Sequence, residues 1–330
     1  MPRPVTLFTG QWTDLPFEEI CQKASRWEYD GLEIACWGDH LDVRRAAGDS
    51  RYVKERKRIL EKYSLKCWAL GAHLSGQCVG DLADERLDAF APEEVKGNPE
   101  GIRRWAVKEM KSTARAAKKM GCSVVTGFMG SPIWKAWYSF PPTSERTVEQ
   151  GYKRILDLWS PILDEFDRNG VRFALEVYPS EIAFDLYTTK KLLEVFGRRP
   201  ALGLNFDPSH LLCQGLEPNL FIREFGDRIY HVHMKDAAVT LDGKAGILGS
   251  FLPFGDVRRG WNFRSLGHGD VNFEEIIREL NSIGYGGPLS VEWEDNNMDR
   301  ELGARESLEF VRRMNFSPSS VSFDKEMKTK

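Results

Sequence analysis

Four apolar runs in the second half of the chain each end in side chains that can bind a hard or borderline metal ion. Two glutamates, one aspartate and one or two histidines form a mixed oxygen and nitrogen set, which suits Mn, Co, Zn or Fe better than Ca or a thiolate-bound metal. One such residue alone is more typical of an ordinary strand end, but four in succession favour a metal site. The runs are Phe173-Ala-Leu-Glu176, Leu202-Gly-Leu-Asn-Phe-Asp207 followed by Pro-Ser-His210, Ile229-Tyr-His-Val-His233, and Leu289-Ser-Val-Glu292.

The placement of these runs predicts that their ends lie close together. A short apolar run between helix-like segments is typical of a buried parallel strand. Parallel strands joined by helical crossovers all point the same way, so their carboxyl ends meet on one face.

The whole chain alternates strand and helix, with eight strands starting near residues 4, 31, 66, 123, 171, 201, 229 and 288. This pattern predicts an α/β fold, a closed (β/α)8 TIM barrel, with long loops after strands 3, 4 and 7. Nothing in the composition suggests a second domain. We therefore expect one domain over residues 1–315 and a polar tail over residues 316–330.

The composition excludes several classes of partner. The net charge is −3 and the pI is about 6.1, without the basic footprint of a nucleic-acid binder. No apolar run is long enough to span a membrane, and the start of the chain does not resemble a signal peptide, so we expect a cytoplasmic protein. The six cysteines are scattered, which is typical of reduced, packed thiols.

The histidines support the predicted site. Each of the six falls at the carboxyl end of a predicted strand or in the loop after it, which suggests that several serve the mouth of the barrel. They are His40, His73, His210, His231, His233 and His268.

Several motifs resemble the sugar phosphate isomerase/epimerase superfamily, the xylose isomerase-like TIM barrel group that includes ketose 3-epimerases, inosose dehydratases and endonuclease IV. The resemblance extends over nearly the whole chain to about residue 315. The motifs are Glu176-Val-Tyr-Pro, Asp207-Pro-Ser-His210, His231-Val-His233-Met-Lys-Asp236, Gly267-His-Gly-Asp-Val-Asn-Phe273 and Gly287-Pro-Leu-Ser-Val-Glu292-Trp-Glu-Asp.

The resemblance implies that Glu176, Asp207, His233 and Glu292 coordinate one divalent ion. The expected ion is Mn²⁺, with Mg²⁺, Co²⁺ or Zn²⁺ as alternatives. Glu176 and Glu292 would also be the catalytic acid/base pair. A divalent ion chelated by a ketose carbonyl and its neighbouring hydroxyl acidifies the intervening C–H and stabilises the enediolate that forms.

We expect five further residues to contact the substrate: Trp37, His73, His210, Lys235 and Arg264. In ketose 3-epimerases an arginine follows the histidine ligand closely, whereas here Lys235-Asp-Ala-Ala-Val-Thr240 follows it. Aromatic residues in the fourth and seventh loops suggest a substrate larger than a bare monosaccharide, as in C-glycoside deglycosidases, whose metal-bearing subunits these loops resemble. They are Trp134, Trp137, Tyr138 and Trp261.

These observations lead to one main hypothesis and two alternatives. The main hypothesis is a metal-dependent isomerase or epimerase that acts on a keto sugar or polyol. We expect it to form a homo-oligomer and to bind neither nucleic acid nor membranes. The first alternative is a lyase, either a dehydratase or an enzyme that cleaves 3-keto-glycosides or C-glycosides, with or without a small partner subunit. The second is a sugar-binding protein on an inactive barrel. Endonuclease IV is disfavoured because it needs three metals and a further Asp and His pair, which we do not find in this sequence.

Overall fold

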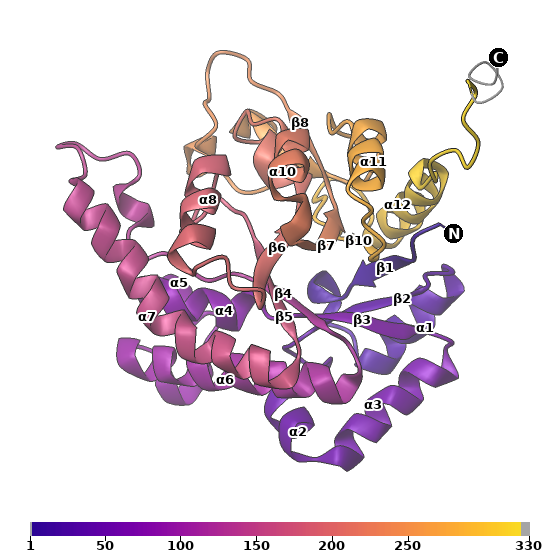
Figure 1. Ribbon diagram of the computed structural model, residues 1–330, viewed down its shortest axis with the longest axis horizontal. Coiled ribbons are helices and arrows are strands. Elements are labelled where there is room, and N and C mark those ends of the chain that lie inside the picture. The colour runs from indigo at the N-terminus through magenta and orange to yellow at the C-terminus, as the bar shows by residue number, and fades with distance from the viewer. Residues whose placement is uncertain (1, 325–330) are drawn as a thin grey trace.

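Eight parallel strands close into a barrel at the centre of the computed structural model, which describes residues 2–324 (Figure 1). Around the barrel the strand order is β1-β10-β7-β6-β5-β4-β3-β2, which confirms the predicted (β/α)8 architecture. The strands are β1 (Val5–Phe8), β2 (Gly31–Ala35), β3 (Lys66–Gly71), β4 (Val124–Gly127), β5 (Arg172–Glu176), β6 (Leu202–Phe206), β7 (Ile229–Met234) and β10 (Leu289–Val291).

Helices pack around the outside of the barrel, and two of them, α6 and α7, lie side by side along one flank (Figure 1). Both of these end at a glycine with positive φ, Gly121 at 88° and Gly170 at 65°, as their sequences predict. Among the described residues, no helix combines the length and hydropathy needed to cross a membrane. The helices are α1 (Phe17–Arg26), α2 (Val43–Gly48), α3 (Ser50–Lys62), α4 (His73–Gly80), α5 (Glu85–Asp88), α6 (Pro99–Met120), α7 (Glu145–Asn169), α8 (Leu186–Val195), α9 (Pro208–Leu212), α10 (Pro218–Phe225), α11 (Phe273–Ser282) and α12 (Arg300–Met314).

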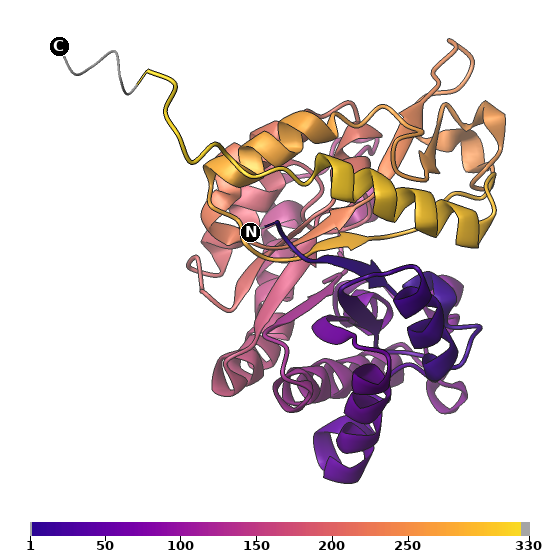
Figure 2. The ribbon, with the colours of Figure 1, turned by 90° about the vertical axis from the view of Figure 1, so that its right-hand side faces the viewer.

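The loop after β7 has structure that the sequence pattern did not reveal. It contains an antiparallel pair, β8 (Asp236–Val239) and β9 (Trp261–Arg264). These strands are too short for a clear periodicity, and they are stabilised by a small apolar cluster that includes Ala237, Trp261 and Phe263. The segment between β8 and β9 projects from the barrel in both views (Figures 1 and 2).

The predicted long loop after β3 also contains short helical segments. It holds the end of α4, the short helix α5 and a 3-10 turn at Glu93–Val95. At the other end of the chain, residues 316–324 contain neither helix nor strand. The rest of the predicted tail, residues 325–330, lies outside the described residues.

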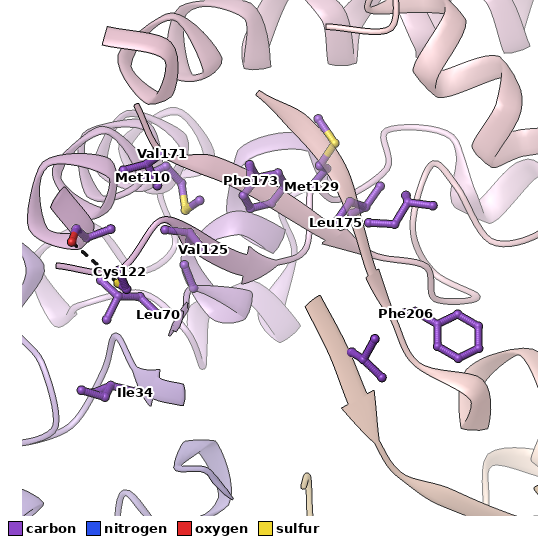
Figure 3. Close-up of a cluster of buried hydrophobic side chains, with 14 of the residues drawn as sticks. Ile34, Leu70, Met110, Cys122, Val125, Met129, Val171, Phe173, Leu175 and Phe206 are labelled. Carbon is purple, nitrogen blue, oxygen red and sulfur yellow. Dashed lines mark hydrogen bonds between the residues drawn. The ribbon is translucent and has the colours of Figure 1, made fainter. Parts of the chain in front are cut away.

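The apolar core lies between the barrel strands and the surrounding helices. Part of it is seen in Figure 3, where Leu70 of β3, Val125 of β4 and Phe173 of β5 are all fully buried. Met110 of α6 packs in the same cluster. Burial of such side chains stabilises the barrel by roughly 1.5–3 kcal/mol each, which makes it a firm support for the loops at its mouth.

Candidate metal centre

Four side chains that could bind a metal come together at the carboxyl end of the barrel. Glu176 is the last residue of β5, Asp207 and Glu292 directly follow β6 and β10, and His233 lies in β7. One ligand atom from each lies within 4.8 Å of all the others, and all four residues are buried. The structure therefore brings together the four residues that the sequence analysis selected as ligands.

The two oxygens of the Asp207 carboxylate have different surroundings, which the local sequence explains. Asp207 caps the N-terminus of α9, and its Oδ1 accepts hydrogen bonds from the backbone N–H of Ser209 at 2.8 Å and its hydroxyl at 2.7 Å. Pro208 fits the first helical position because no N–H is needed there. The second oxygen, Oδ2, accepts no hydrogen bond among the described residues and is left for the cluster.

The His233 ring is held between two sets of carboxylates. Its Nε2 lies 3.0 and 3.2 Å from the two oxygens of Glu33. Its Nδ1 faces the cluster, 3.0 Å from Glu176 Oε2 and 3.0 Å from Glu292 Oε2. An N–H donated to a carboxylate on one side of an imidazole leaves the other nitrogen available to a metal ion, an arrangement common in metalloproteins.

Glu33 was not selected from the sequence, although a charged residue inside the apolar strand Gly31–Ala35 is a visible signal. It is fully buried, and four side chains contact its carboxylate: His233, His231 Nε2 at 2.8 Å, Ser290 Oγ at 2.7 Å and the Thr126 hydroxyl. Burial opposes ionisation, but His233 and His231 together hold the pKa of Glu33 well below its usual value. Glu33 is therefore a fixed anion behind His233.

Replacing Glu33 with glutamine is expected to weaken metal binding by about 10–100-fold, the range found for residues that orient a ligand. The amide can present an N–H where His233 needs an acceptor, so the ring loses its defined orientation. Titration of metal-free protein with Mn²⁺ measures the effect. Glu181→Gln is the matched control, because Glu181 is equally buried but bonds to the backbone of Met129 and Gly130 instead. Equal affinities for Glu33→Gln and the control would contradict this role.

The donor set fits a divalent cation. His233 Nδ1 and Asp207 Oδ2 are both buried without a hydrogen-bond partner among the described residues. Burial raises the pKa of Glu292, but Lys235 and His233 lower it to about 2. Burial likewise opposes a charged His233, yet Glu33, Glu292 and Glu176 raise its pKa well above the ordinary value. The pocket thus favours positive charge at its centre.

Two further histidines hold Glu176. His210 Nε2 lies 2.9 Å from Glu176 Oε1, and His73 Nε2 lies 3.2 Å from Oε2. Asn205 also donates to Oε2 at 2.7 Å. Burial raises the pKa of Glu176, but His233, helped by hydrogen bonds from His210 and His73, holds it well below the usual value. Glu176 is therefore an oriented carboxylate that is ionised at neutral pH.

Lys235 is a buried cation beside the cluster. Its Nζ lies 3.2 Å from Glu292 Oε2 and 2.5 Å from Glu294 Oε2. Gln11 Nε2 bridges the same two glutamates, at 2.8 Å from Glu292 Oε1 and 3.1 Å from Glu294 Oε1. Burial lowers the pKa of Lys235, but Glu292 and Glu294 raise it well above its ordinary value, so the ammonium stays charged. Glu294 and Gln11 were not selected from the sequence.

A cavity of about 550 Å³ opens over this cluster. Trp37, His73, His210 and Lys235, four of the residues expected to contact substrate, line it. Arg264 is not among its described lining residues, and its Nη1 lies 3.8 Å from Asp295 Oδ1. The cavity has the size and mixed lining of a small-molecule site.

Aromatic rings surround the metal cluster in a continuous series of contacts. The distances between neighbouring ring centroids run from 4.5 to 5.5 Å, within the range for favourable aromatic pairs. The series is Phe8, His73, Phe128, Tyr178, His210 and Phe263. Such rings shield the charged groups from bulk water, and all six line the main cavity.

The aromatic residues that the sequence analysis emphasised lie elsewhere. Trp134 and Trp137 line a separate cavity of about 260 Å³, and Tyr138 is 82% exposed. Trp261 packs against Phe254, which does line the main cavity. The main cavity is lined by other aromatic residues, among them Phe8, Phe128 and Tyr178.

The two remaining histidines do not reach the cluster. His40 is buried, with Nδ1 2.9 Å from Thr9 Oγ1 and Nε2 3.2 Å from the Leu15 carbonyl oxygen. His268 is near the surface, and its Nε2 lies 3.0 Å from Glu306 Oε2. Both have structural partners, so position in a loop after a strand did not by itself identify a site residue.

Asp236 explains why the Gly267-His-Gly motif accompanies the Lys235-Asp236 pair. Its buried carboxylate accepts four backbone N–H groups, including those of Gly267 and Gly269 at 3.0 Å each. A Cβ on Gly269 would lie 2.3 Å from Asp236 Oδ1, so only glycine permits this approach. The motif fixes the loop beside Lys235.

Glu181 is a further buried acid near the mouth of the barrel and should give the protein a distinctive pH dependence. It is fully buried, and burial raises its pKa to about 8 although the backbone N–H groups of Met129 and Gly130 oppose this. The folded pKa lies above the unfolded value of about 4.3. The folded state therefore holds the proton more tightly, and its stability falls as the pH rises from about 4.3 to about 8.

We expect Glu181→Gln to remove this loss, because the amide oxygen can still accept both backbone bonds. The free energy of unfolding of the variant should exceed that of the wild type by a few kcal/mol at pH 8, and by much less at pH 5. Urea unfolding at several pH values measures the difference. A difference that does not change with pH would show that Glu181 is ionised in the folded protein throughout.

Comparison with known proteins identifies the family. The profile described as "Xylose isomerase-like TIM barrel" matches residues 21–314. The chain belongs to this family. The resemblance inferred from its motifs is thereby confirmed.

Relatives extend over different shares of the chain. The uncharacterized protein YfiH of Bacillus subtilis is 27% identical over 309 residues, 90% of this chain and 95% of that protein. An inosose dehydratase of Clostridium beijerinckii is 27% identical over 191 residues, 57% of this chain and 59% of that enzyme. Among solved structures, a 3-keto-D-glucoside 4-epimerase of E. coli is 15% identical with a TM-score of 0.67, covering 94% of this chain and 99% of that one. At 15% identity, the match to this solved structure shows that the two proteins share a fold.

Proposed function

We propose that the protein is a divalent-metal-dependent isomerase or epimerase of a keto sugar or polyol. The observation that carries the proposal is the pair Glu176 and Glu292. Both carboxylates line the cavity, and both lie 3.0 Å from Nδ1 of His233. The reaction needs a cation site with carboxylates beside it, and this arrangement supports both requirements.

The residues of the chain have distinct tasks in this proposal. Glu176, Asp207, His233 and Glu292 would hold the metal, for which Mn²⁺ is our first choice. When bound, the metal supplies a Lewis acid that polarises the substrate carbonyl. Glu176 and Glu292 remove and return the proton on the carbon beside that carbonyl.

The positions of the two glutamates in the barrel suit work on both sides of a carbon atom. They come from β5 and β10, which lie three places apart in the ring of eight strands, so they enter the cavity from different directions. Lys235 and His210 flank them and could donate to substrate oxygens. His73 and Trp37 complete the walls.

Names among the relatives support a sugar reaction of this kind and favour one alternative. Solved structures of the same fold include an L-ribulose 3-epimerase, 17% identical with a TM-score of 0.62, covering 95% of this chain and 94% of that one. The sequence relatives also include inosose dehydratases. A dehydratase begins with the same proton abstraction but then expels a leaving group from the neighbouring carbon. A lyase, including one that cleaves 3-keto-glycosides, is therefore the second candidate.

Turnover of a panel of keto sugars and 3-keto-glycosides in deuterated water tests the proposal. The metal-loaded protein is expected to incorporate deuterium at the carbon beside the carbonyl, which mass spectrometry detects. Label without loss of any group supports an isomerase or epimerase. Loss of water or an aglycone moves the protein to the lyase class. Absence of both label and release across the panel would contradict the proposal.

A further inference from the structure

The cavity has a second, apolar part beyond the metal cluster. Leu87 and Phe90, from the loop after β3, and Phe254, from the loop after β7, line it together with the cluster. In the barrel order, β3 and β7 lie four places apart in a ring of eight, which makes them opposite strands. The two loops therefore rise from opposite sides of the barrel, and we name the part of the cavity lined by Leu87, Phe90 and Phe254 the outer slot.

Both walls of the outer slot are held in place. Phe254 stacks on Phe263 with centroids 5.3 Å apart and an interplanar angle of 20°, and Arg259 lies over its ring at 4.2 Å. Asn296 Nδ2 donates to the Phe254 carbonyl oxygen at 2.8 Å. On the opposite wall, Leu87 is 2% exposed and anchors the turn that carries Phe90. The slot is thus formed before any ligand enters.

Phe90 and Phe254 keep apolar surface available to a ligand. Their exposed fractions are 38% and 42%, although both line a cavity. Polar neighbours are occupied with each other, since Gln77 Nε2 donates to Asp81 Oδ2 at 3.0 Å. A ligand group in this position would gain mainly by burying apolar surface, with stacking on the aromatic faces.

The charges of the cavity select against an anionic group. Arg86, which also lines it, is directed at Asp84, with Nε 2.8 Å from Oδ1 and Nη2 2.9 Å from Oδ2. Lys235 is enclosed by Glu292 and Glu294. Both cations already face carboxylates, which favours a neutral ligand group over an anionic one.

The volume of the cavity agrees with a ligand that consists of a sugar ring and a substituent. Cavities of roughly 300–1,000 Å³ hold drug-sized ligands, and this one measures about 550 Å³, more than a single sugar ring needs. We infer that the outer slot binds a neutral, apolar and preferably planar substituent on the sugar, so that the substrate is a glycoside with an apolar aglycone. This inference rests on the proposed function, which places the sugar ring at the metal cluster.

Binding of unreactive glycosides tests the slot directly. Calorimetry on the metal-loaded protein compares phenyl and methyl glucosides, each as both anomers. We expect the better phenyl glucoside to bind at least about tenfold more tightly than its methyl counterpart. Phe90→Ala and Phe254→Ala should each reduce this ratio to below about threefold. Phe251→Ala is the matched control, because Phe251 lies in the same loop as Phe254, is fully exposed and is not among the described lining residues.

Each outcome has a defined meaning. Equal affinities for phenyl and methyl glucosides, or no binding of either, would overturn the inference. A ratio that survives both Phe90→Ala and Phe254→Ala would also overturn it, because the apolar group would then bind elsewhere. Tighter binding of glucose 6-phosphate than of methyl glucoside would contradict a neutral ligand. Deuterium uptake by free keto sugars does not require the slot, so uptake without phenyl selectivity would leave the proposed function standing.

Discussion

Purified His233→Ala protein is expected to retain less than about a tenth of the metal bound by the wild type after loading and desalting. His233 supplies the one nitrogen of the proposed ligand set, and its Nδ1 lies 3.0 Å from both Glu176 and Glu292. Loss of a ligand should weaken metal binding by more than about a hundredfold. This exceeds the usual effect of replacing a residue that only orients a ligand. Elemental analysis measures the metal content directly.

The loss of metal should also appear in stability. A metal ion at about 100 times its Kd stabilises the wild type by about 2.7 kcal/mol, and His233→Ala should gain almost nothing from the same addition. His40→Ala and His268→Ala are the controls, one buried and one near the surface, and both lie outside the cluster. If His233→Ala binds as much metal as these controls, His233 is not a ligand.

The fold and the centre of the site could be predicted because each depends on a strong local pattern. Buried parallel strands are short apolar runs, and a ligand at a strand end stands directly after such a run, as Glu176 and Glu292 do. Barrel closure then brings the strand ends together. The order of the strands around the barrel follows from the regular alternation of strand and helix.

The outer parts of the site depend on tertiary contacts that no local pattern contains. Glu33 became visible as a partner of His233 only when β2 and β7 were placed in one barrel. Arg264, which we expect from the sequence to contact substrate, lies in β9 with its Nη1 3.8 Å from Asp295 Oδ1 and is not among the described residues that line the cavity. Phe90 and Phe254 line the same cavity although they come from loops that follow opposite strands, β3 and β7.

Glu176→Gln and Glu292→Gln are each expected to slow the solvent exchange of one epimer of a keto sugar by about 10²–10⁴-fold, the usual contribution of a positioned acid or base. Surrounding cations and hydrogen bonds keep the pKa of both carboxylates low, so each is ionised and able to accept a proton at neutral pH. An amide of the same shape cannot. Since both residues belong to the proposed ligand set, the variants are compared at saturating metal with their metal content measured.

The pattern of solvent exchange in the two variants shows whether one glutamate or both act as the base. If Glu176 and Glu292 act on opposite sides of the carbon, each variant should still exchange the hydrogen of one epimer while losing exchange of the other. The epimer that remains active should differ between the two variants, because the carboxylates enter the cavity from different strands. Loss of exchange for both epimers in one variant alone would assign that glutamate as a single base. Exchange within threefold of the wild type in both variants would exclude either carboxylate from the proton transfer.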